Sequence, residues 1–247
     1  MSDIAPHARR GRLTAAAASL LVLAGVLLLV VGLRAQRHAP QPPAAAAVPY
    51  ASSQPSSQLS SQPAARPPAR SGRPATGASS QAAAKPVTGP LLGRSVPLRL
   101  EIPQLKVSSD LLQLGLNSDQ SVQVPPLGKD SPAGWYKYSP TPGQLGPSVL
   151  LGHVDSAEYG PGIFFRLGAL RPGSTVSVTR TDRTTAVFRV DRVVSYSKDN
   201  FPTLEVYGNT DSAQLRLITC GGKFDLSSHH YENNIVAFAT LVSSHPA

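Results

Sequence analysis

From residue 93 onward the sequence predicts a mainly β domain, either a barrel or a sandwich, and three observations support this. Apolar and polar residues alternate with a period of two, as in strands that bury one face. The apolar runs are short and rich in β-branched residues. Pro and Gly separate them, as in SPAG, TPGQLG and GPG. Regularly spaced short strands with turn residues between them are typical of these two architectures.

Six stretches of this region are expected to be strands. Three are predicted by alternation and three by short apolar, β-branched runs. A short helical turn is expected only at 162–170, GIFFRLGAL. The sequence has no glycine-rich loop between a strand and a helix, so nucleotide binding has no support. The expected strands are 97–102 (PLRLEI), 148–152 (SVLLG), 175–180 (TVSVTR), 186–197 (AVFRVDRVVSYS), 214–220 (QLRLITC) and 234–242 (NIVAFATLV).

An uncharged apolar run near the N-terminus predicts a membrane helix. The run 14–33 has about 20 residues, which matches a bilayer core of roughly 30 Å. Arginines flank it on both sides. The run is longer than the apolar region of a cleaved signal peptide, about 7–15 residues, and no clear Ala-x-Ala site follows it. We therefore expect a signal anchor at 14–33, with residues 1–13 in the cytoplasm.

The next segment, 34–92, has the composition of a disordered spacer. It consists mainly of Pro, Ala, Ser and Gln, and SSQPSSQLSSQP is a near-repeat. Such a segment has few large apolar side chains to bury, so it cannot offset the entropy cost of becoming ordered. Frequent Pro favours an extended chain that could hold a domain away from a membrane. The folded domain is then expected at 93–247.

Charge and cysteine content exclude several function classes. Residues 1–92 carry nine Lys/Arg and one acid, whereas residues 93–247 carry fourteen Lys/Arg and thirteen acids. The folded domain is therefore nearly neutral and lacks the basic cluster of a nucleic-acid-binding protein, so we expect no nucleic-acid partner. One cysteine excludes an intramolecular disulfide and a multi-cysteine metal site. No metal or other cofactor is expected.

The single cysteine, Cys220, ends a predicted strand. In QLRLITC, alternation places Arg216 and Ile218 on the strand face that carries Cys220. Gly221 and Gly222 are expected to end the strand and to leave space beside the sulfur. Free cysteines are nevertheless among the most buried residues, and taken alone this favours a core position.

A nucleophilic cysteine needs a base. Ionising a thiol of pKa about 8.5 at pH 7 costs roughly 2 kcal/mol, which a neighbouring imidazolium can offset. His153 directly follows the run SVLLG and so also stands at a predicted strand end, whereas His229 and His230 lie in a polar stretch typical of a surface loop. Asp155 could orient His153 or cap the turn after it. For any single histidine, a structural role is the commoner one.

The motifs around both residues resemble the sortase family. LLGHVDS is followed 67 residues later by LRLITCGG, and the family's cysteine motif is T-L-x-T-C. GWYKYSPTPGQLGPSVLLGHVDS, FFRLGALRPGSTVSV and TCGGKFD…YENNIVAFA are similar to class E/F sortases of actinobacteria. The resemblance covers roughly residues 95–243. It implies a closed β-barrel of seven or eight strands, held at the cell membrane by a single-pass anchor with the catalytic domain outside the cell.

The resemblance also implies an activity and its partners. Sortases cleave LPxTG-like sorting signals of surface proteins between Thr and Gly. Cys220 would attack the Thr carbonyl to form a thioester, and His153 would protonate the leaving amine. An amine nucleophile of a cell-wall precursor would then release the product. An L,D-transpeptidase, another wall enzyme with Cys and His, has a Ser-x-Gly-Cys motif that RLITCGG does not fit.

One family feature is absent from the sequence. Sortases use an arginine near the start of the strand after the cysteine, and 230–235 reads HYENNI, without Arg or Lys. We expect Arg216, Ile218 and Asn234 to contact the substrate instead, although Arg216 is equally typical of a solvent-exposed strand residue. The missing arginine leaves open a second hypothesis, a sortase-like barrel that binds sorting or wall peptides without efficient turnover.

Overall fold

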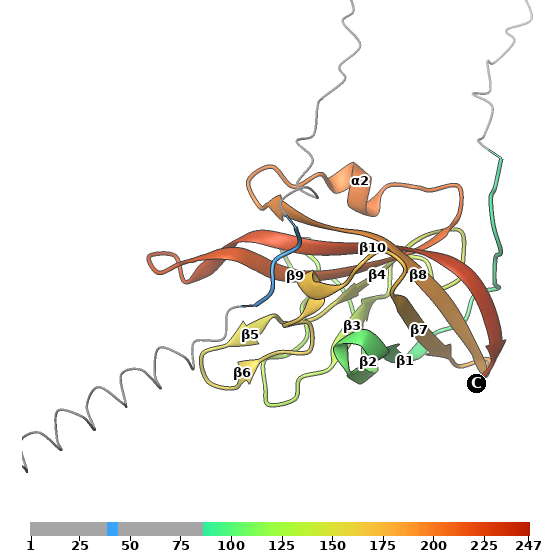
Figure 1. The fold of residues 1–247 in the computed structure, drawn as a ribbon, viewed down its shortest axis with the longest axis horizontal. Coiled ribbons are helices and arrows are strands. Elements are labelled where there is room, and N and C mark those ends of the chain that lie inside the picture. Colours follow the sequence, from blue (N-terminus) through green and yellow to red (C-terminus); the bar gives the residue numbers. More distant parts are fainter. Residues whose placement is uncertain (1–38, 44–85) are drawn as a thin grey trace, which may run out of the picture. The chain divides into compact units, whose positions relative to one another are not determined.

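The computed structural model describes residues 39–43 and 86–247, and its centre is a closed β-barrel (Figure 1). The strand order around the barrel is β1-β2-β3-β4-β9-β10-β8-β7. Seven of its eight pairings join strands that follow each other around this order, and β7 closes it against β1. The barrel strands are β1 (Pro97–Ile102), β2 (Val107–Leu114), β3 (Ala133–Tyr136), β4 (Gly146–Leu151), β7 (Thr175–Arg180), β8 (Thr184–Ser197), β9 (Ala213–Asp225) and β10 (His230–Pro246).

Short elements decorate the loops of the barrel. A two-stranded sheet follows β4, and a five-residue helix lies between β8 and β9. Within the expected helical turn at 162–170 the chain forms only a 3-10 turn. These elements are β5 (Asp155–Ser156), β6 (Gly160–Pro161), α2 (Thr203–Tyr207) and the 3-10 turns η2 (Pro103–Leu105) and η3 (Leu167–Ala169).

The mainly β prediction is confirmed, and of the two architectures the chain forms the barrel. β1 and β7 have the predicted bounds, and each of the other four predicted strands overlaps an observed one. Two barrel strands were not predicted. β2 has the sequence VSSDLLQL, whose burial does not alternate, and β3 is only four residues long and begins with Ala and Gly. Neither shows the periodicity from which a strand can be predicted.

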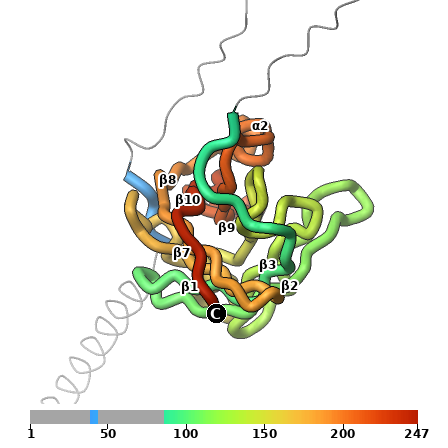
Figure 2. Tube along the Cα trace, turned by 90° about the vertical axis from the view of Figure 1, so that its right-hand side faces the viewer, coloured from blue at the N-terminus to red at the C-terminus, as the bar shows by residue number. Residues whose placement is uncertain are grey.

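Two hydrophobic clusters lie on opposite faces of the sheet. The larger cluster fills the barrel and includes Trp135, Leu215 and Leu217. The smaller one lies outside, where α2 and its flanking loop cover β4, β8, β9 and β10 with Val206 at its centre. Figures 1 and 2 both show α2 outside the barrel beside β10. Of the two faces of β9, therefore, one is core and the other is partly covered by the β8–β9 connection.

Contacts to the barrel begin before residue 93. The N–H of Thr88 donates to the carbonyl of Asp211 at 2.7 Å, and that of Leu92 to the carbonyl of Gly143 at 2.8 Å. The predicted anchor at 14–33 and most of the predicted spacer lie outside the described residues. Within 39–43 and 86–247, no helix has the length and apolar character needed to span a membrane.

Candidate functional site

The two faces of β9 are those that the alternation predicts. Leu215 and Leu217 belong to the cluster inside the barrel, whereas Ile218 belongs to the cluster outside it. Cys220 follows Ile218 by two residues and therefore shares its outer face. The thiol is partly exposed and forms no disulfide. The interpretation of Cys220 as a fully buried core residue is therefore wrong.

β9 does not end after Cys220, contrary to the expectation from the two glycines. The strand continues to Asp225, and its pairing with β10 shifts register between Tyr231 and Asn233. At this irregularity Gly222 has φ +77°, a backbone conformation that favours glycine. A Cβ on Gly222 would lie 2.8 Å from Cγ of Asn233. The glycines thus form a bulge that bends the strand beside the sulfur instead of ending it.

His153 is brought beside Cys220 by a parallel strand pair. β4 runs parallel to β9 with Gly146 opposite Ala213 and Leu151 opposite Ile218. The N–H of Gly152 then donates to the carbonyl of Ile218 at 3.2 Å. The same register, continued two residues further, places His153 level with Cys220. Because neighbouring strands lie about 4.8 Å apart, His153, just past the end of β4, lies beside Cys220 within β9.

His153 and Cys220 line one cavity of about 590 Å³. Most of its wall consists of apolar side chains, and polar groups lie between them. Such an arrangement is typical of small-ligand and peptide sites. The lining residues are Val122, Val124, Pro125, Leu127, Leu151, Gly152, His153, Val154, Asp155, Ser156, Ala157, Lys198, Tyr207, Ile218, Thr219, Cys220, Phe224, His229, His230, Tyr231 and Asn234.

The imidazole of His153 is held by the loop between β2 and β3. Its Nε2 lies 2.7 Å from the carbonyl oxygen of Pro125. Because a carbonyl only accepts, Nε2 carries the proton and Nδ1 is the nitrogen that can exchange a proton with a thiol. The same carbonyl would also stabilise the imidazolium.

A second hydrogen bond connects two segments of the cavity wall. The hydroxyl of Tyr231, on β10, donates to Oδ2 of Asp155, on β5, at 2.6 Å. Burial, followed by this bond, raises the pKa of Tyr231. The Tyr231 ring also packs edge-to-face on Phe224 at a centroid distance of 5.1 Å. Asp155 is therefore bonded to Tyr231 instead of orienting His153.

Two of the three expected substrate-contacting residues lie at the cavity. Ile218 and Asn234 line it, and Asn234 is the residue of β10 that stands opposite Cys220. Thr219 also lines the cavity, and its buried hydroxyl has no hydrogen-bond partner among the described residues. The apolar and polar groups next to the sulfur thus come from β9 and β10 together.

Arg216, the third, is not brought to the cavity. It is 2% exposed, with its guanidinium over the Phe238 ring at 4.4 Å. Its nitrogens donate to the carbonyl of Leu215 at 3.2 Å and to Oε1 of Gln214 at 2.6 Å. Burial lowers its pKa to about 10. Neither sequence-based interpretation, substrate contact or solvent exposure, agrees with this position, because the connection that carries α2 covers the strand face here.

Several cavity residues were not singled out from the sequence. His229 ends the β9–β10 turn and His230 begins β10; both are exposed as predicted, but they line the cavity. Val124 and Leu127 are more than half exposed on the loop that holds His153. Large apolar residues in a Pro- and Gly-containing loop were a usable signal for a binding surface. Lys198 gave no such signal, because its position depends on strand register.

Within the described residues, no group of three or more His, Cys, Asp or Glu could hold a metal ion.

Similarities to known proteins are found among family models and among solved structures. No curated protein matches the chain. Among solved structures, sortase A of Listeria monocytogenes is similar with 18% identity and a TM-score of 0.45, over 63% of this chain and 92% of that one.

Two further solved structures are similar to the same extent. Sortase A of Actinomyces oris has 18% identity and a TM-score of 0.45 over 65% of this chain and 88% of that one. Sortase A of Corynebacterium diphtheriae has 18% identity and a TM-score of 0.46 over 61% and 62%. The family model described as Sortase domain matches residues 100–242, more than half of the chain, and the chain therefore belongs to the sortase family of cysteine transpeptidases.

Proposed function

We propose that this chain cleaves an LPxTG-like sorting signal through a thioester on Cys220 and transfers the acyl group to an amine of a cell-wall precursor. The observation that supports this most is the register of the parallel β4–β9 pair, which brings His153 level with Cys220 on one cavity. A thiol and an imidazole in this arrangement are the two groups that nucleophilic acyl transfer requires.

The reaction proceeds in two balanced steps. The thiolate of Cys220 attacks the Thr carbonyl carbon, the C–S bond forms, and the C–N bond to Gly breaks as the His153 imidazolium protonates the leaving amine. The incoming amine then attacks the thioester and gives a proton to His153. The C–S bond breaks, an amide forms, and the thiolate–imidazolium pair is restored.

The cavity wall suits the substrate of the proposal. Apolar side chains such as Val124, Leu151 and Ile218 offer contact area to the Leu and Pro of an LPxTG-like peptide. Asn234, opposite Cys220 in the β9–β10 pairing, would hydrogen-bond peptide backbone. The peptide would lie along the outer face of β9, between the β2–β3 loop and the start of β10.

The cellular setting is part of the same proposal. The run at 14–33 would anchor the chain in the cell membrane, and the Pro-rich spacer would carry the catalytic domain on the outer side. The motifs quoted above support a class E/F type of sortase. The partners would be surface proteins that carry sorting signals.

Mass spectrometry of the full-length chain tests the proposal. After incubation with a library of LPxTG-like peptides, a thioester adduct should appear on Cys220, and an added amine should release the transpeptidation product. Cys220→Ala should yield neither. Product formation by Cys220→Ala would exclude the proposed mechanism.

One observation favours the second hypothesis, a barrel that binds peptides without turnover. The start of β10, His230 to Asn234, carries no Lys or Arg. In the same experiment, peptide binding by the wild-type chain with neither adduct nor product would support this alternative.

A further inference from the structure

The cavity of the proposed function contains one lysine side chain. Of the described residues that line it, Lys198 is the single Lys or Arg, and Asp155 is the single acid. Asp155 accepts the Tyr231 hydroxyl bond and so already has a partner. Among the described residues, no ion pair or side-chain hydrogen bond involves the ammonium of Lys198, whose side chain is exposed.

Strand register explains why Lys198 reaches this cavity. Asn234 of β10 stands opposite Cys220 of β9 on one side and opposite Tyr196 of β8 on the other. Tyr196 belongs to the outer cluster, so it shares the face of Cys220. Lys198 lies two residues beyond Tyr196, and its N–H continues the ladder by donating to the carbonyl of Glu232 at 3.0 Å. The period of two then returns Lys198 to the same face.

These spacings leave room for a substrate between the ammonium and the sulfur. Two strand intervals and two residues along the strand separate the backbones of Lys198 and Cys220, which amounts to about 12 Å. A lysine side chain spans roughly half of this distance. The remaining gap is the width of a peptide backbone, so the ammonium can reach a carbonyl oxygen that the thiolate attacks from the other side.

The chemistry of acyl transfer gives such an ammonium a role. Attack by Cys220 turns the carbonyl oxygen into an oxyanion, and an apolar wall solvates that charge poorly. His153 cannot hold it, because its proton is needed at the leaving amine. We propose that Lys198 is a catalytic residue that binds the scissile carbonyl oxygen and stabilises the oxyanion. This inference rests on the proposed function and assigns the cation that the start of β10 lacks.

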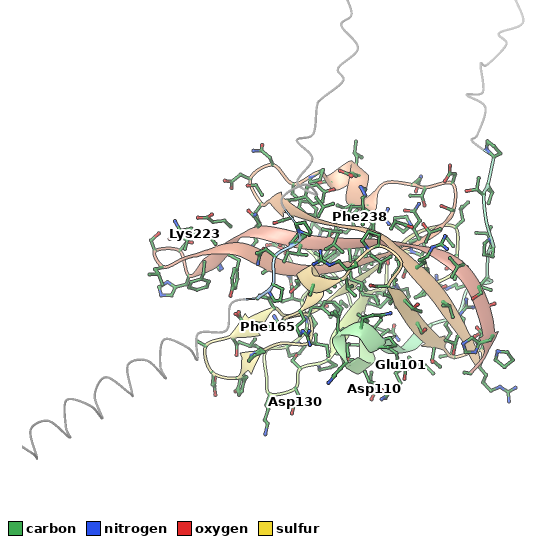
Figure 3. All side chains as sticks on the ribbon, in the orientation of Figure 1. Glu101, Asp110, Asp130, Phe165, Lys223 and Phe238 are labelled. Atoms are coloured by element: carbon green, nitrogen blue, oxygen red, sulfur yellow. The ribbon has the colours of Figure 1, made fainter. Side chains whose placement is uncertain are left out.

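Steady-state kinetics of the full-length chain with a sorting peptide and an amine tests this role. Lys198→Met should lower kcat on the order of 100-fold and change KM by less than about threefold, because the contact strengthens in the transition state. Lys198→Arg keeps a charged donor and should stay within about tenfold of wild type. Lys223→Met is the matched control, an exposed lysine of the projecting β9–β10 hairpin that does not line the cavity (Figure 3), and should match wild type.

The outcomes separate this inference from the proposed function. Turnover by wild type with an unchanged kcat in Lys198→Met would overturn the role of Lys198 and leave the proposed function standing. A raised KM with an unchanged kcat would overturn it too, because Lys198 would then contribute ground-state binding alone. Failure of wild type to form any thioester would remove the proposed function and this inference with it. Circular dichroism of each variant identifies a loss of fold.

Discussion

Two polar regions on the outer face of β9 lie four residues apart and differ in what covers them. At Arg216 the guanidinium is buried, hydrogen-bonded and stacked on Phe238. At Cys220 the same face opens into the cavity that holds His153 and Lys198. A charged side chain near Cys220 is therefore not sufficient for a functional role. A residue on this face is structural where the β8–β9 connection covers it. Where the connection leaves the face open, the residue is accessible to a substrate.

The covered region around Arg216 contains a second arginine, Arg192. Arg192 packs on the Phe238 ring at 3.8 Å and donates to Oε1 of Glu205 on α2 at 2.7 Å. Burial of the ring, followed by its interaction with Glu205, raises the pKa of Tyr196. Figure 3 shows Phe238 on β10 below α2. The Arg192–Glu205 pair thus joins the helix to β8 above the strand face on which Arg216 is buried.

The largest effect is expected at the open region. His153→Ala should lower the rate at which iodoacetamide labels Cys220 at pH 7 by roughly 100-fold or more, because the thiolate of the proposed mechanism would lose its neighbouring imidazolium. The rate is measured by mass spectrometry of the alkylated chain. His245→Ala, at the exposed end of β10, is the control and should label like wild type. Equal rates in all three proteins would contradict the assignment of His153.

The next largest effect is expected on the stability of the fold, when Arg216 in the covered region is replaced. Arg216→Ala should lower the free energy of unfolding by about 2–4 kcal/mol, since it removes a buried side chain that packs on Phe238. Arg216→Met fills most of the same volume without a buried charge and should cost less than about 1.5 kcal/mol. Urea unfolding followed by tryptophan fluorescence measures both.

The Arg216 variants also test whether the covered region affects the reactivity of Cys220. Labelling of Cys220 should stay within about twofold of wild type in Arg216→Met, because Arg216 does not line the cavity. A large loss of transpeptidation in a folded Arg216→Met chain would restore the substrate-contacting role expected from the sequence.

The contrast also shows what the sequence could predict. Alternation assigned the correct faces of β9, and the sortase resemblance selected His153 and Cys220 from six histidines and one cysteine. The sequence could not predict that Arg216 is buried, because the segment that covers it includes α2, whose five residues are too few for a helical periodicity. Lys198 was missed for a related reason. Its neighbours depend on the pairing of β8 with β10, two strands that α2 and β9 separate in the chain, and no sequence pattern sets that register.

A smaller effect is expected where the cavity wall is tied together. Tyr231→Phe removes the hydroxyl that donates to Asp155 and should lower the free energy of unfolding by about 1 kcal/mol. The two wall segments would then separate more easily, so KM for the sorting peptide should rise a few-fold while kcat changes less. Urea unfolding and steady-state kinetics measure the two quantities, and Tyr159→Phe, on the β5–β6 turn, is the matched control.

The smallest effect concerns the turn between β9 and β10, next to the cavity residues His229 and His230. Hydrogen bonds from Ser227, first from its N–H and then from its hydroxyl, lower the pKa of Asp225 to about 2. A carboxyl whose pKa is lowered in the folded state stabilises that state fully above its unfolded value near 3.8, and the contribution is lost as the pH falls toward 2. The turn should therefore be unaffected by pH near neutrality and loosen between about pH 4 and 2.

NMR titration of the Asp225 carboxyl checks this prediction. A midpoint near 3.8 would mean that the serines do not hydrogen-bond this carboxylate in solution. Ser227→Ala should move the midpoint upward and leave labelling of Cys220 at pH 7 unchanged, because the turn shapes the rim of the cavity without touching its reacting groups.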